Sequence, residues 1–534
     1  MANQYKVTEK DLQQTVDAWK SCSTVADAAR RLGLARSSFR TRLAIARRQG
    51  LLDEREVHPL EPAESSEPVY ERGLKQKAKV YIVTAAQNAT PVDPEWWQIL
   101  LQIAKQRKAE LLVIPVRYKN PTSQWSGSQE GAEWWEEEVR PYLWNVRKAL
   151  NANLTVLGDL KIQPTASSPL TGADALSLAS SGIIGHTKLQ MKTVPTPSNR
   201  MAKILTTTGA CTVENYTDSR AGKIAEFHHS LSAIIVEIEG GHFHMRQLHY
   251  DRKTSSCTDL DTRYYPNGYG KAPPALALVM GDTHVRFIDP NVEAATFGPG
   301  GIIQTLQPQH LIWHDVLDAY SCNPHHEGDP FVAVAKIAAD MNNVRDEVKE
   351  AIDFVLKHTP RGMTSVIIDS NHDDFLRRWI VNGDWKRNPR NAEFYLETAL
   401  AMVRGTRMTG KGTEYPSPFA HWLVKASGMC AGEIRAMQTD ESFVLGGVEL
   451  SMHGDRGPNG ARGTIRNLRR IGIRSVIGHS HAPGIDEGCY QTGTSTRLRL
   501  EYNHGASGWL NAHCVVNADG KRQIIIIIDG DWRA

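Results

Sequence analysis

The side chains in this sequence best suited to chemistry are aspartates, histidines and an asparagine that follow short apolar runs. One such run, Ser365 to Ile368, is β-branched and is followed by Asn371, His372 and Asp373. A run of this kind is typical of a buried strand, and ligands in open α/β folds lie just past the carboxyl ends of strands. The triplet is therefore a candidate site, although these residue types also occur in loops as turn formers.

Four further apolar runs end in residues of the same kind. An Asp and a His two residues apart at a strand end can both face one ion. Because the set mixes oxygen and nitrogen donors, it suits Mn²⁺, Fe or Zn²⁺ rather than a thiolate site. In chain order the five motifs are Asp282-Thr283-His284, Asp315-Val316-Leu317-Asp318, Asn371-His372-Asp373, His453-Gly454 and Gly478-His479-Ser480-His481.

These motifs resemble the signature of the calcineurin-like metallophosphoesterases, which runs D-x-H, G-D-x-x-D, G-N-H-D, H and G-H-x-H. All five blocks occur in the family's order between Asp282 and His481. The resemblance implies two divalent metal ions, with Mn²⁺ expected and Fe, Zn²⁺ or Mg²⁺ as alternatives. The implied ligands are Asp282, His284, Asp315 and His481 for one metal, and Asp315, Asn371, His453 and His479 for the other.

The same resemblance implies roles for three residues that are not metal ligands. His372 would donate a proton or hydrogen bond to the leaving oxygen, and Asp373 would fix its orientation. Asp318 would lie just outside the ligands, and its spacing from the preceding aspartate is similar to that in the bacterial SbcD-type nucleases of the recombination-repair branch. The chain departs from the signature at His314 and Ser370, which stand where the family has glycines.

The strands and helices that must position these residues predict an α/β protein. A chain of 534 residues is too long for one hydrophobic core, so about three units are expected. The resemblance implies a four-layer α-β-β-α sandwich over residues 273–534, and a helical segment is expected over 331–357. An α/β middle domain is predicted over 80–272. Residues 53–79 are rich in acid and proline and predict a linker.

The first 52 residues show the pattern of three short helices. Thr8 is placed to cap a helix over 9–20, a second is expected over 24–32, and a third follows Gly33 over 37–48. The segment resembles the small helix-turn-helix modules of bacterial and phage regulators, whose recognition helix contacts DNA. An oligomerisation or docking module with a solvated basic face is the alternative. The residues expected to contact DNA are Arg36, Ser38, Arg40, Arg42 and Arg47.

The middle domain begins with a β-α-β pattern. Strands are expected at 80–83 and 111–116, with a helix over 95–108 between them, which predicts a parallel pair. Residues 155–250 predict a mixed or mainly antiparallel region. The pairs Trp96-Trp97 and Trp134-Trp135 could stack on bases, but packing is the preferred interpretation. Structural roles are also expected for the histidines at 228, 229, 242 and 244.

The composition is that of an ordinary globular protein, with 41% hydrophobic and 23% charged residues. A net charge of +3 gives no strong prediction of an anionic partner. Seven scattered cysteines without a C-x-x-C pair favour a reducing, cytoplasmic setting. Because no apolar stretch approaches the roughly 20 residues that span a bilayer, neither secretion nor membrane insertion is expected.

A metallophosphoesterase core does not by itself select a substrate. The basic N-terminal segment, the extra α/β domain and arginines near the last motif favour a polyanion, although those arginines could equally form a solvated helix face. The layout is similar to the early-expressed host-DNA-degrading nucleases of large tailed bacteriophages. We therefore predict a Mn²⁺-dependent DNase with DNA as partner, assembled as a homo-oligomer, and acting in the host cytoplasm if phage-encoded. The arginines are Arg462, Arg466, Arg469, Arg470 and Arg474.

Two other functions are consistent with the sequence. One is a phosphatase or phosphodiesterase that acts on nucleotides or other small phosphoesters. The other is a DNA-binding regulatory protein whose metal site does not turn over, which the presence of His372 argues against.

Overall fold

The computed structural model describes residues 7–22, 25–52, 70–71, 78–118, 134–410, 412–501 and 503–533. The chain divides into two compact units, residues 1–69 and 70–534, which are described separately. Of the predicted linker over 53–79, the described residues are 70–71 and 78–79.

The N-terminal unit is a bundle of three helices, α1 (Glu9–Ser21), α2 (Val25–Arg31) and α3 (Arg36–Arg48), which confirms the three predicted helices to within about two residues. Thr8 begins α1 as expected, because its side chain accepts a hydrogen bond from the Asp11 amide and the Asp11 carboxylate bonds back to Thr8. Gly33 follows α2 with φ +62°, a conformation that glycine adopts without strain. The bundle core includes Leu12, Val16, Trp19, Ala28, Phe39, Leu43 and Ala46.

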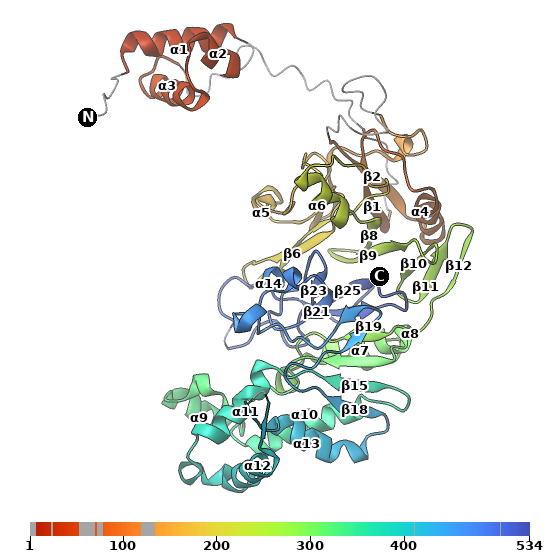
Figure 1. Ribbon diagram of the computed structural model, residues 1–534, viewed down its shortest axis with the longest axis vertical. Coiled ribbons are helices and arrows are strands. Elements are labelled where there is room, and N and C mark those ends of the chain that lie inside the picture. The colour runs from red at the N-terminus through yellow and green to blue at the C-terminus, as the bar shows by residue number, and fades with distance from the viewer. Residues whose placement is uncertain are drawn as a thin grey trace. The chain divides into compact units, whose positions relative to one another are not determined.

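The second unit is a mixed α/β structure built on three large sheets (Figure 1). A seven-stranded sheet has the order β12-β11-β10-β9-β8-β1-β2. Its strands are β1 (Val80–Gln87), β2 (Glu110–Val116), β8 (Ser232–Glu239), β9 (His242–Asp251), β10 (Ser256–Asp259), β11 (Thr262–Tyr265) and β12 (Gly268–Lys271). The pair β1 and β2 is parallel and is joined through α4 (Pro94–Arg107), which confirms the predicted β-α-β start. Trp96 and Trp97 of α4 are buried, so they pack in the core, as the preferred interpretation expected.

A six-stranded sheet has the order β18-β15-β14-β13-β24-β25, and its first four strands run parallel. A ten-stranded sheet has the order β19-β20-β21-β23-β22-β6-β7-β5-β4-β3. The strands of the six-stranded sheet are β13 (Ala277–Val279), β14 (His310–Trp313), β15 (Thr364–Ile367), β18 (Glu433–Ala436), β24 (Asn511–Val516) and β25 (Arg522–Ile527). Those of the ten-stranded sheet are β3 (Arg147–Asn151), β4 (Leu154–Leu157), β5 (Ser181–Ile184), β6 (Gln190–Val194), β7 (Lys203–Thr207), β19 (Val444–Leu445), β20 (Val448–Glu449), β21 (Arg474–Ile477), β22 (Gly484–Asp486) and β23 (Cys489–Gln491).

The ten-stranded sheet joins the two stretches that the sequence separates at residue 273. Its strand β22 pairs with β6, so residues from both sides of that position form one sheet. One hydrophobic core also takes side chains from all three sheets, among them Val83, Ile204, Val279 and Val476. Residues 70–534 accordingly form one compact unit. As expected, residues 155–250 are mixed, with parallel β4, β5 and β7 and antiparallel β8 and β9.

Helices cover the other face of the six-stranded sheet, and Figure 1 shows α10, α11, α12 and α13 gathered beside β15 and β18. The predicted helix over 331–357 is two helices, because Asn343 caps a new helix by accepting a hydrogen bond from the Asp346 amide. The remaining helices are α5 (Ala173–Leu176), α6 (Arg220–His228), α7 (Pro290–Phe297), α8 (Ile302–Leu306), α9 (Pro330–Ala338), α10 (Val344–Lys357), α11 (Asn371–Asn382), α12 (Ala392–Gly405), α13 (Pro418–Ala426) and α14 (Ile465–Leu468).

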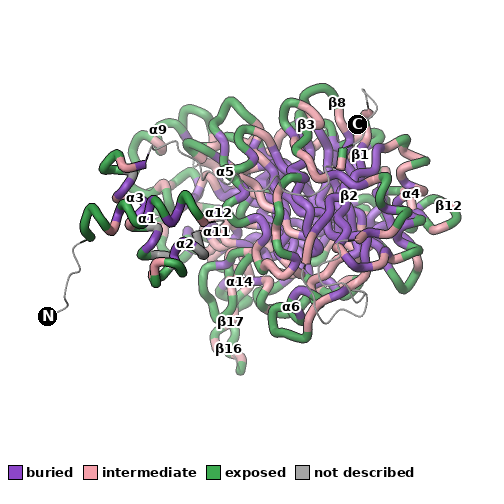
Figure 2. The backbone as a smooth tube through the Cα atoms, turned by 90° about the horizontal axis from the view of Figure 1, so that it is seen from above, coloured by how far each residue is buried: buried purple, intermediate pink, exposed green. Residues whose placement is uncertain are grey.

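Burial follows this layering. In Figure 2 the strands near β1 and β2 are mostly buried, whereas the hairpin of β16 (Arg407–Thr409) and β17 (Gly412–Glu414) is exposed or half-buried. Within the described part of the chain, no helix combines the length and the apolar character that a membrane crossing requires.

Candidate metal centre

The five predicted strand-end motifs follow strands of two sheets, as expected. Strands β13, β14 and β15 are neighbouring parallel strands of the six-stranded sheet, so their carboxyl ends lie at one edge. Strands β20 and β21 form a parallel pair in the ten-stranded sheet. Because side chains of the two sheets share a core, the loops after these five strands converge at one place. Topology therefore brings together residues that lie up to about 200 positions apart in the chain.

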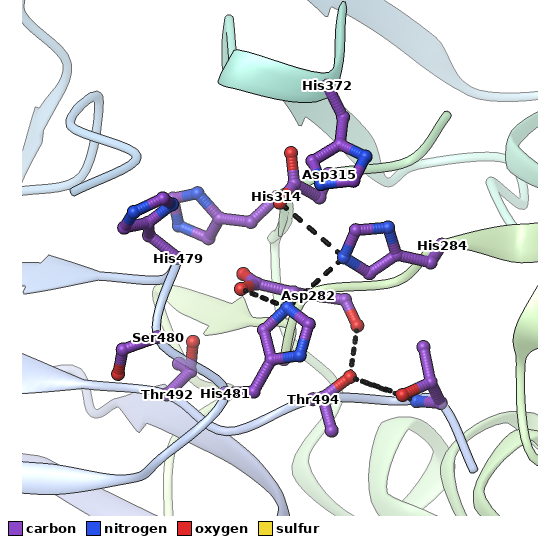
Figure 3. Close-up of polar contacts among 12 residues, drawn as sticks. Asp282, His284, His314, Asp315, His372, His479, Ser480, His481, Thr492 and Thr494 are labelled. Atoms are coloured by element: carbon purple, nitrogen blue, oxygen red, sulfur yellow. Dashed lines mark hydrogen bonds and ion pairs between the residues drawn. The ribbon is translucent and has the colours of Figure 1, made fainter. Parts of the chain in front are cut away.

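Four buried side chains form the tightest part of this centre. Asp282, His284, Asp315 and His481 each offer a ligand atom, and these atoms all lie within 4.8 Å of one another. His481 Nε2 is 3.2 Å from Asp282 Oδ2 and 3.2 Å from His284 Nε2. His284 Nε2 is 3.5 Å from Asp315 Oδ2. Figure 3 shows these side chains turned toward a common point, as four ligands of one ion would be.

A second group meets the first at Asp315. The Nε2 atom of His453 is 3.2 Å from Asp315 Oδ2 and 3.0 Å from Asn371 Oδ1. The Nδ1 atom of His479 is also 3.0 Å from Asn371 Oδ1. All seven residues implied by the resemblance as ligands are thus brought together, with Asp315 between the two groups.

Several buried polar atoms in the centre lack a hydrogen-bond partner among the described residues. They include Oδ1 of Asp282 and Oδ1 of Asp315. A buried polar atom without a partner costs about 1–3 kcal/mol, more if it is charged, so such atoms call for an explanation. A divalent cation supplies it, since carboxylate and imidazole donors suit Mn²⁺, Fe and Zn²⁺. The residues present therefore fit a metal.

The electrostatics of the centre also favour a cation. Burial would raise the pKa of Asp315, but the charges of His453 and other histidines hold it well below its ordinary value. Burial would lower the pKa of His284, but Asp318 and Asp315 raise it to about 9. Burial would also lower the pKa of His453, but the charge of Asp315 and a hydrogen bond with it raise that pKa to about 9. Without a metal ion, protonated imidazoles neutralise the negative charge of the carboxylates. A bound metal ion would supply that positive charge instead.

Backbone strain is concentrated at the same residues. His284, Asp315, His479 and His481 have φ angles of +40°, +45°, +76° and +58°. Non-glycine residues adopt this region rarely, and each instance costs on the order of 1–3 kcal/mol. The strain persists because the surrounding structure fixes it, and such residues cluster at ligand sites.

His372 lies at the edge of the centre, and Asp318 positions it. The Nδ1 atom of His372 donates a hydrogen bond to the backbone carbonyl of Asp318 at 2.7 Å. The carboxylate of Asp318 is 2.8 Å from Nδ1 of His284 and 3.7 Å from Nδ1 of His372. This places Asp318 just outside the ligands, as the resemblance implied.

Asp373 does not have the predicted contact with His372. It lies in the first turn of α11, where adjacent residues point in different directions, and its buried Oδ1 has no partner among the described residues. Burial, with Asp369 and Asp315, raises the pKa of Asp373 well above its ordinary value. Among the described residues, the contacts with Nδ1 of His372 come from Asp318. Ser370, which replaces a family glycine, caps α11 by accepting a hydrogen bond from the Asp373 amide.

Two residues of the centre received no role from the sequence. His314 is fully buried, and its Nδ1 lies 3.3 Å from Nδ1 of His453. At Gly478 an added methyl group would lie 2.3 Å from Asp282 Oδ1 and 3.0 Å from His314 Cγ. The glycine of the Gly478-His479-Ser480-His481 motif is the signal that could have revealed this close approach.

The residues predicted to contact DNA belong to α3 of the N-terminal unit. Ser38 is exposed, and Arg42 Nη1 is 3.4 Å from Asp11 Oδ1 within the bundle. The side chains of Arg36, Arg40 and Arg47 lie outside what the structure describes.

Sequence similarity decides the family. The chain is 31% identical over 472 residues to "Protein A1" of Escherichia phage T5, an alignment that covers 86% of this chain and 84% of that protein. The chain belongs to the family of phage T5 protein A1. No protein-family model matches it. The relationship identifies the chain as related to a bacteriophage protein over most of its length, with a buried Asp and His cluster able to hold a metal ion.

Proposed function

We propose that this member of the protein A1 family is a metallophosphoesterase that hydrolyses phosphodiester bonds of DNA. The observation that carries the proposal is the convergence of all seven implied ligands around Asp315. The donor types, the order of the motifs and the strand ends they follow all match what a two-metal hydrolase needs. DNA as the partner, Mn²⁺ as the metal and host DNA degradation as the setting belong to the same proposal.

When bound, a metal pair supplies charge neutralisation for the phosphoryl oxygens and lowers the pKa of water for attack. Asp282, His284, Asp315 and His481 would hold one ion, and Asp315, Asn371, His453 and His479 the other. Asp318 fixes the ring of His284 through Nδ1, which leaves Nε2 directed at the centre. The carbonyl of Asp318 occupies Nδ1 of His372, so Nε2 of His372 is the atom that delivers a proton to the leaving oxygen.

An arginine-rich segment supports a polyanionic substrate. It joins the ligand His453 after β20 to strand β21, whose end leads to His479 and His481. Because cations in such a position can neutralise backbone phosphates, the segment supports DNA over a small ester. Its exposed arginines include Arg462, Arg466, Arg470 and Arg474. We further propose that the three-helix unit acts as a helix-turn-helix that holds DNA through α3.

The test is hydrolysis of plasmid and linear duplex DNA by the full chain, beside p-nitrophenyl phosphate esters and nucleotides, with Mn²⁺, Mg²⁺, Zn²⁺ and Fe²⁺. We expect metal-dependent DNA cleavage that falls about 10²- to 10⁴-fold in His372→Ala, with bound metal retained. The matched control is His242→Ala, since His242 is 44% exposed and lies in β9. Turnover of small esters with intact DNA would support the phosphatase alternative. DNA binding without any turnover would support the regulatory one.

A further inference from the structure

A cavity of about 300 Å³ is lined by the end of α6 and by the segment that joins α14 to β21. Five cationic side chains and one carboxylate, that of Glu487, face it. Its residues come from both sides of residue 273, so the cavity exists only because the two stretches share a sheet. The cations are Lys188, Arg469, Arg474, Lys521 and Arg522.

Three of these cations already have protein partners. Glu487 Oε1 is 2.9 Å from Lys188 Nζ, and Arg469 Nη1 is 2.7 Å from Asp486 Oδ1 and 3.4 Å from Glu487 Oε1. Arg522 Nη1 donates to the backbone carbonyls of Ser475 and Gly488 at 2.9 and 2.7 Å. The side chains of the other two, Lys521 and Arg474, make neither a hydrogen bond nor an ion pair with the described residues. Two cationic side chains of the cavity thus have no direct carboxylate partner among the described residues, and the charges of Asp251 and Asp519 act on Lys521 from a longer distance.

The charge is also partly shielded from water. Burial lowers the pKa of Lys521, and Arg474 and Arg522 lower it further, against the opposing charges of Asp251 and Asp519. Burial, together with Lys521 and Arg522, lowers the pKa of His249 on the cavity wall to about 3, so that ring is neutral. An anion placed between Lys521 and Arg474 would offset their mutual repulsion.

An aromatic ring lies at the edge of the same cavity. Phe227 is 81% exposed, and neighbouring Ile473 is 49% exposed. A large exposed apolar side chain beside a charged cavity points to a ligand with both a flat apolar part and an anionic part. Nucleic-acid bases stack on aromatic side chains in this way.

We propose that this cavity binds a nucleotide, with its phosphate held by Lys521 and Arg474 and its base packed on Phe227. The volume lies at the lower end of the range for small-molecule sites, about 300–1,000 Å³. The cavity is distinct from the metal centre, because Arg474 begins β21 whereas the ligands His479 and His481 follow its end. The site is therefore independent of whether the metal centre hydrolyses DNA.

The test is isothermal titration calorimetry of the full chain with deoxyadenosine monophosphate, inorganic phosphate and a 5′-phosphorylated hexadeoxyadenylate. Loss of one charge-assisted hydrogen bond should weaken nucleotide binding about tenfold or more in Lys521→Ala and in the exposed Arg474→Ala variant. Phe227→Ala should weaken binding of the nucleotide and leave that of phosphate unchanged. Arg404→Ala is the matched control, since this exposed arginine of α12 does not line the cavity.

The variant Asp315→Asn separates this site from the metal centre and should retain nucleotide binding. Binding that is lost in Asp315→Asn and unchanged in Arg474→Ala would overturn the proposal. Equal affinity for phosphate and nucleotide, with no effect of Phe227→Ala, would overturn the assignment of a base. Tighter binding of the hexanucleotide than of the monophosphate would show that the ligand is the end of a DNA strand. Tighter binding of the monophosphate would show that the ligand is a free nucleotide.

Discussion

Two buried clusters of charged side chains in this protein differ in how completely protein atoms satisfy them. In the seven-stranded sheet, Arg246 donates to Glu237 at 2.8 Å and to Asp259 at 2.9 Å, and Arg107 contacts both carboxylates. Every side-chain nitrogen and oxygen of that triad has a partner. In the metal centre, by contrast, Oδ1 of Asp282 and Oδ1 of Asp315 have no hydrogen-bond partner among the described residues.

This difference distinguishes a structural ion cluster from a ligand site. Both clusters are buried and both shift pKa values, so burial and pKa shifts alone do not distinguish them. Of the two clusters, the metal centre alone combines carboxylate oxygens that lack a hydrogen-bond partner with strained backbone. The strained residues are His284, Asp315, His479 and His481. The atoms of a complete cluster are all engaged with one another, whereas an incomplete cluster has atoms that a metal ion could bind.

The largest expected effect is on activity, from Asp315→Asn. This change removes the carboxylate between the two ligand groups, and several kcal/mol of charge stabilisation correspond to a loss on the order of 10³-fold in hydrolysis. Bound metal, measured by mass spectrometry of the purified protein, should fall as well. Asp218→Asn is the control, because the Asp218 side chain is 93% exposed. Full activity in Asp315→Asn would exclude the proposed centre.

The next effect is on stability, from Arg246→Met in the complete cluster. Leaving Glu237 and Asp259 without this partner should cost about 3–5 kcal/mol of unfolding free energy, independent of added metal. Urea denaturation with and without Mn²⁺ measures it. The control Arg252→Met, at a 51% exposed arginine, should cost less than about 1 kcal/mol. A loss that added Mn²⁺ reverses would contradict the distinction between the two clusters.

Asp318→Asn should weaken metal affinity or activity about 10- to 100-fold, because it removes the carboxylate charge that lies 2.8 Å from Nδ1 of the ligand His284. Asp373→Asn should have a smaller effect, since the raised pKa of Asp373 already favours a neutral side chain. Mn²⁺ titration and DNA hydrolysis compare the two variants. The opposite ranking would restore the sequence-based role of Asp373.

Gly478→Ala should destabilise the protein by about 1–3 kcal/mol and reduce metal binding, because the new methyl group collides with Asp282 and His314. Thermal unfolding with and without Mn²⁺ measures both effects. Gly428→Ala is the matched control, since a methyl group there meets nothing within 4 Å. Equal melting temperatures for the two variants would show that the loop at Gly478 yields freely.

The smallest expected effect is a change in pH dependence. Burial would raise the pKa of Glu237, but Arg246 and Arg107 lower it to about 2 from its ordinary 4.5. A lowered folded-state pKa contributes stability that is present above pH 4.5 and lost as pH falls toward 2. The stability difference between the native chain and Glu237→Gln should therefore shrink over that interval. Denaturation curves at pH 7, 4 and 3 test this, and a constant difference would refute it.

Local patterns predicted much of the fold. The cap at Thr8, the break at Gly33 and the apolar faces of the N-terminal helices are encoded within a few residues, and the structure confirms them. The same holds for β1, α4 and β2 and for the strands that precede the five motifs. The helix over 331–357 failed as a single element because the capping residue Asn343 starts a second helix inside the apolar pattern.

The sequence alone predicted which aspartates, histidines and asparagine follow the strands, because residue type and position after a β-branched run are local properties. The family resemblance implied that they are ligands of one centre. Three features were visible only in the tertiary structure. Strand β22 pairs with β6 in one sheet, Asp318 rather than Asp373 contacts His372, and cations lie around Lys521. These features depend on contacts between residues distant in the chain and on the direction of each side chain. A linear pattern does not specify either of them.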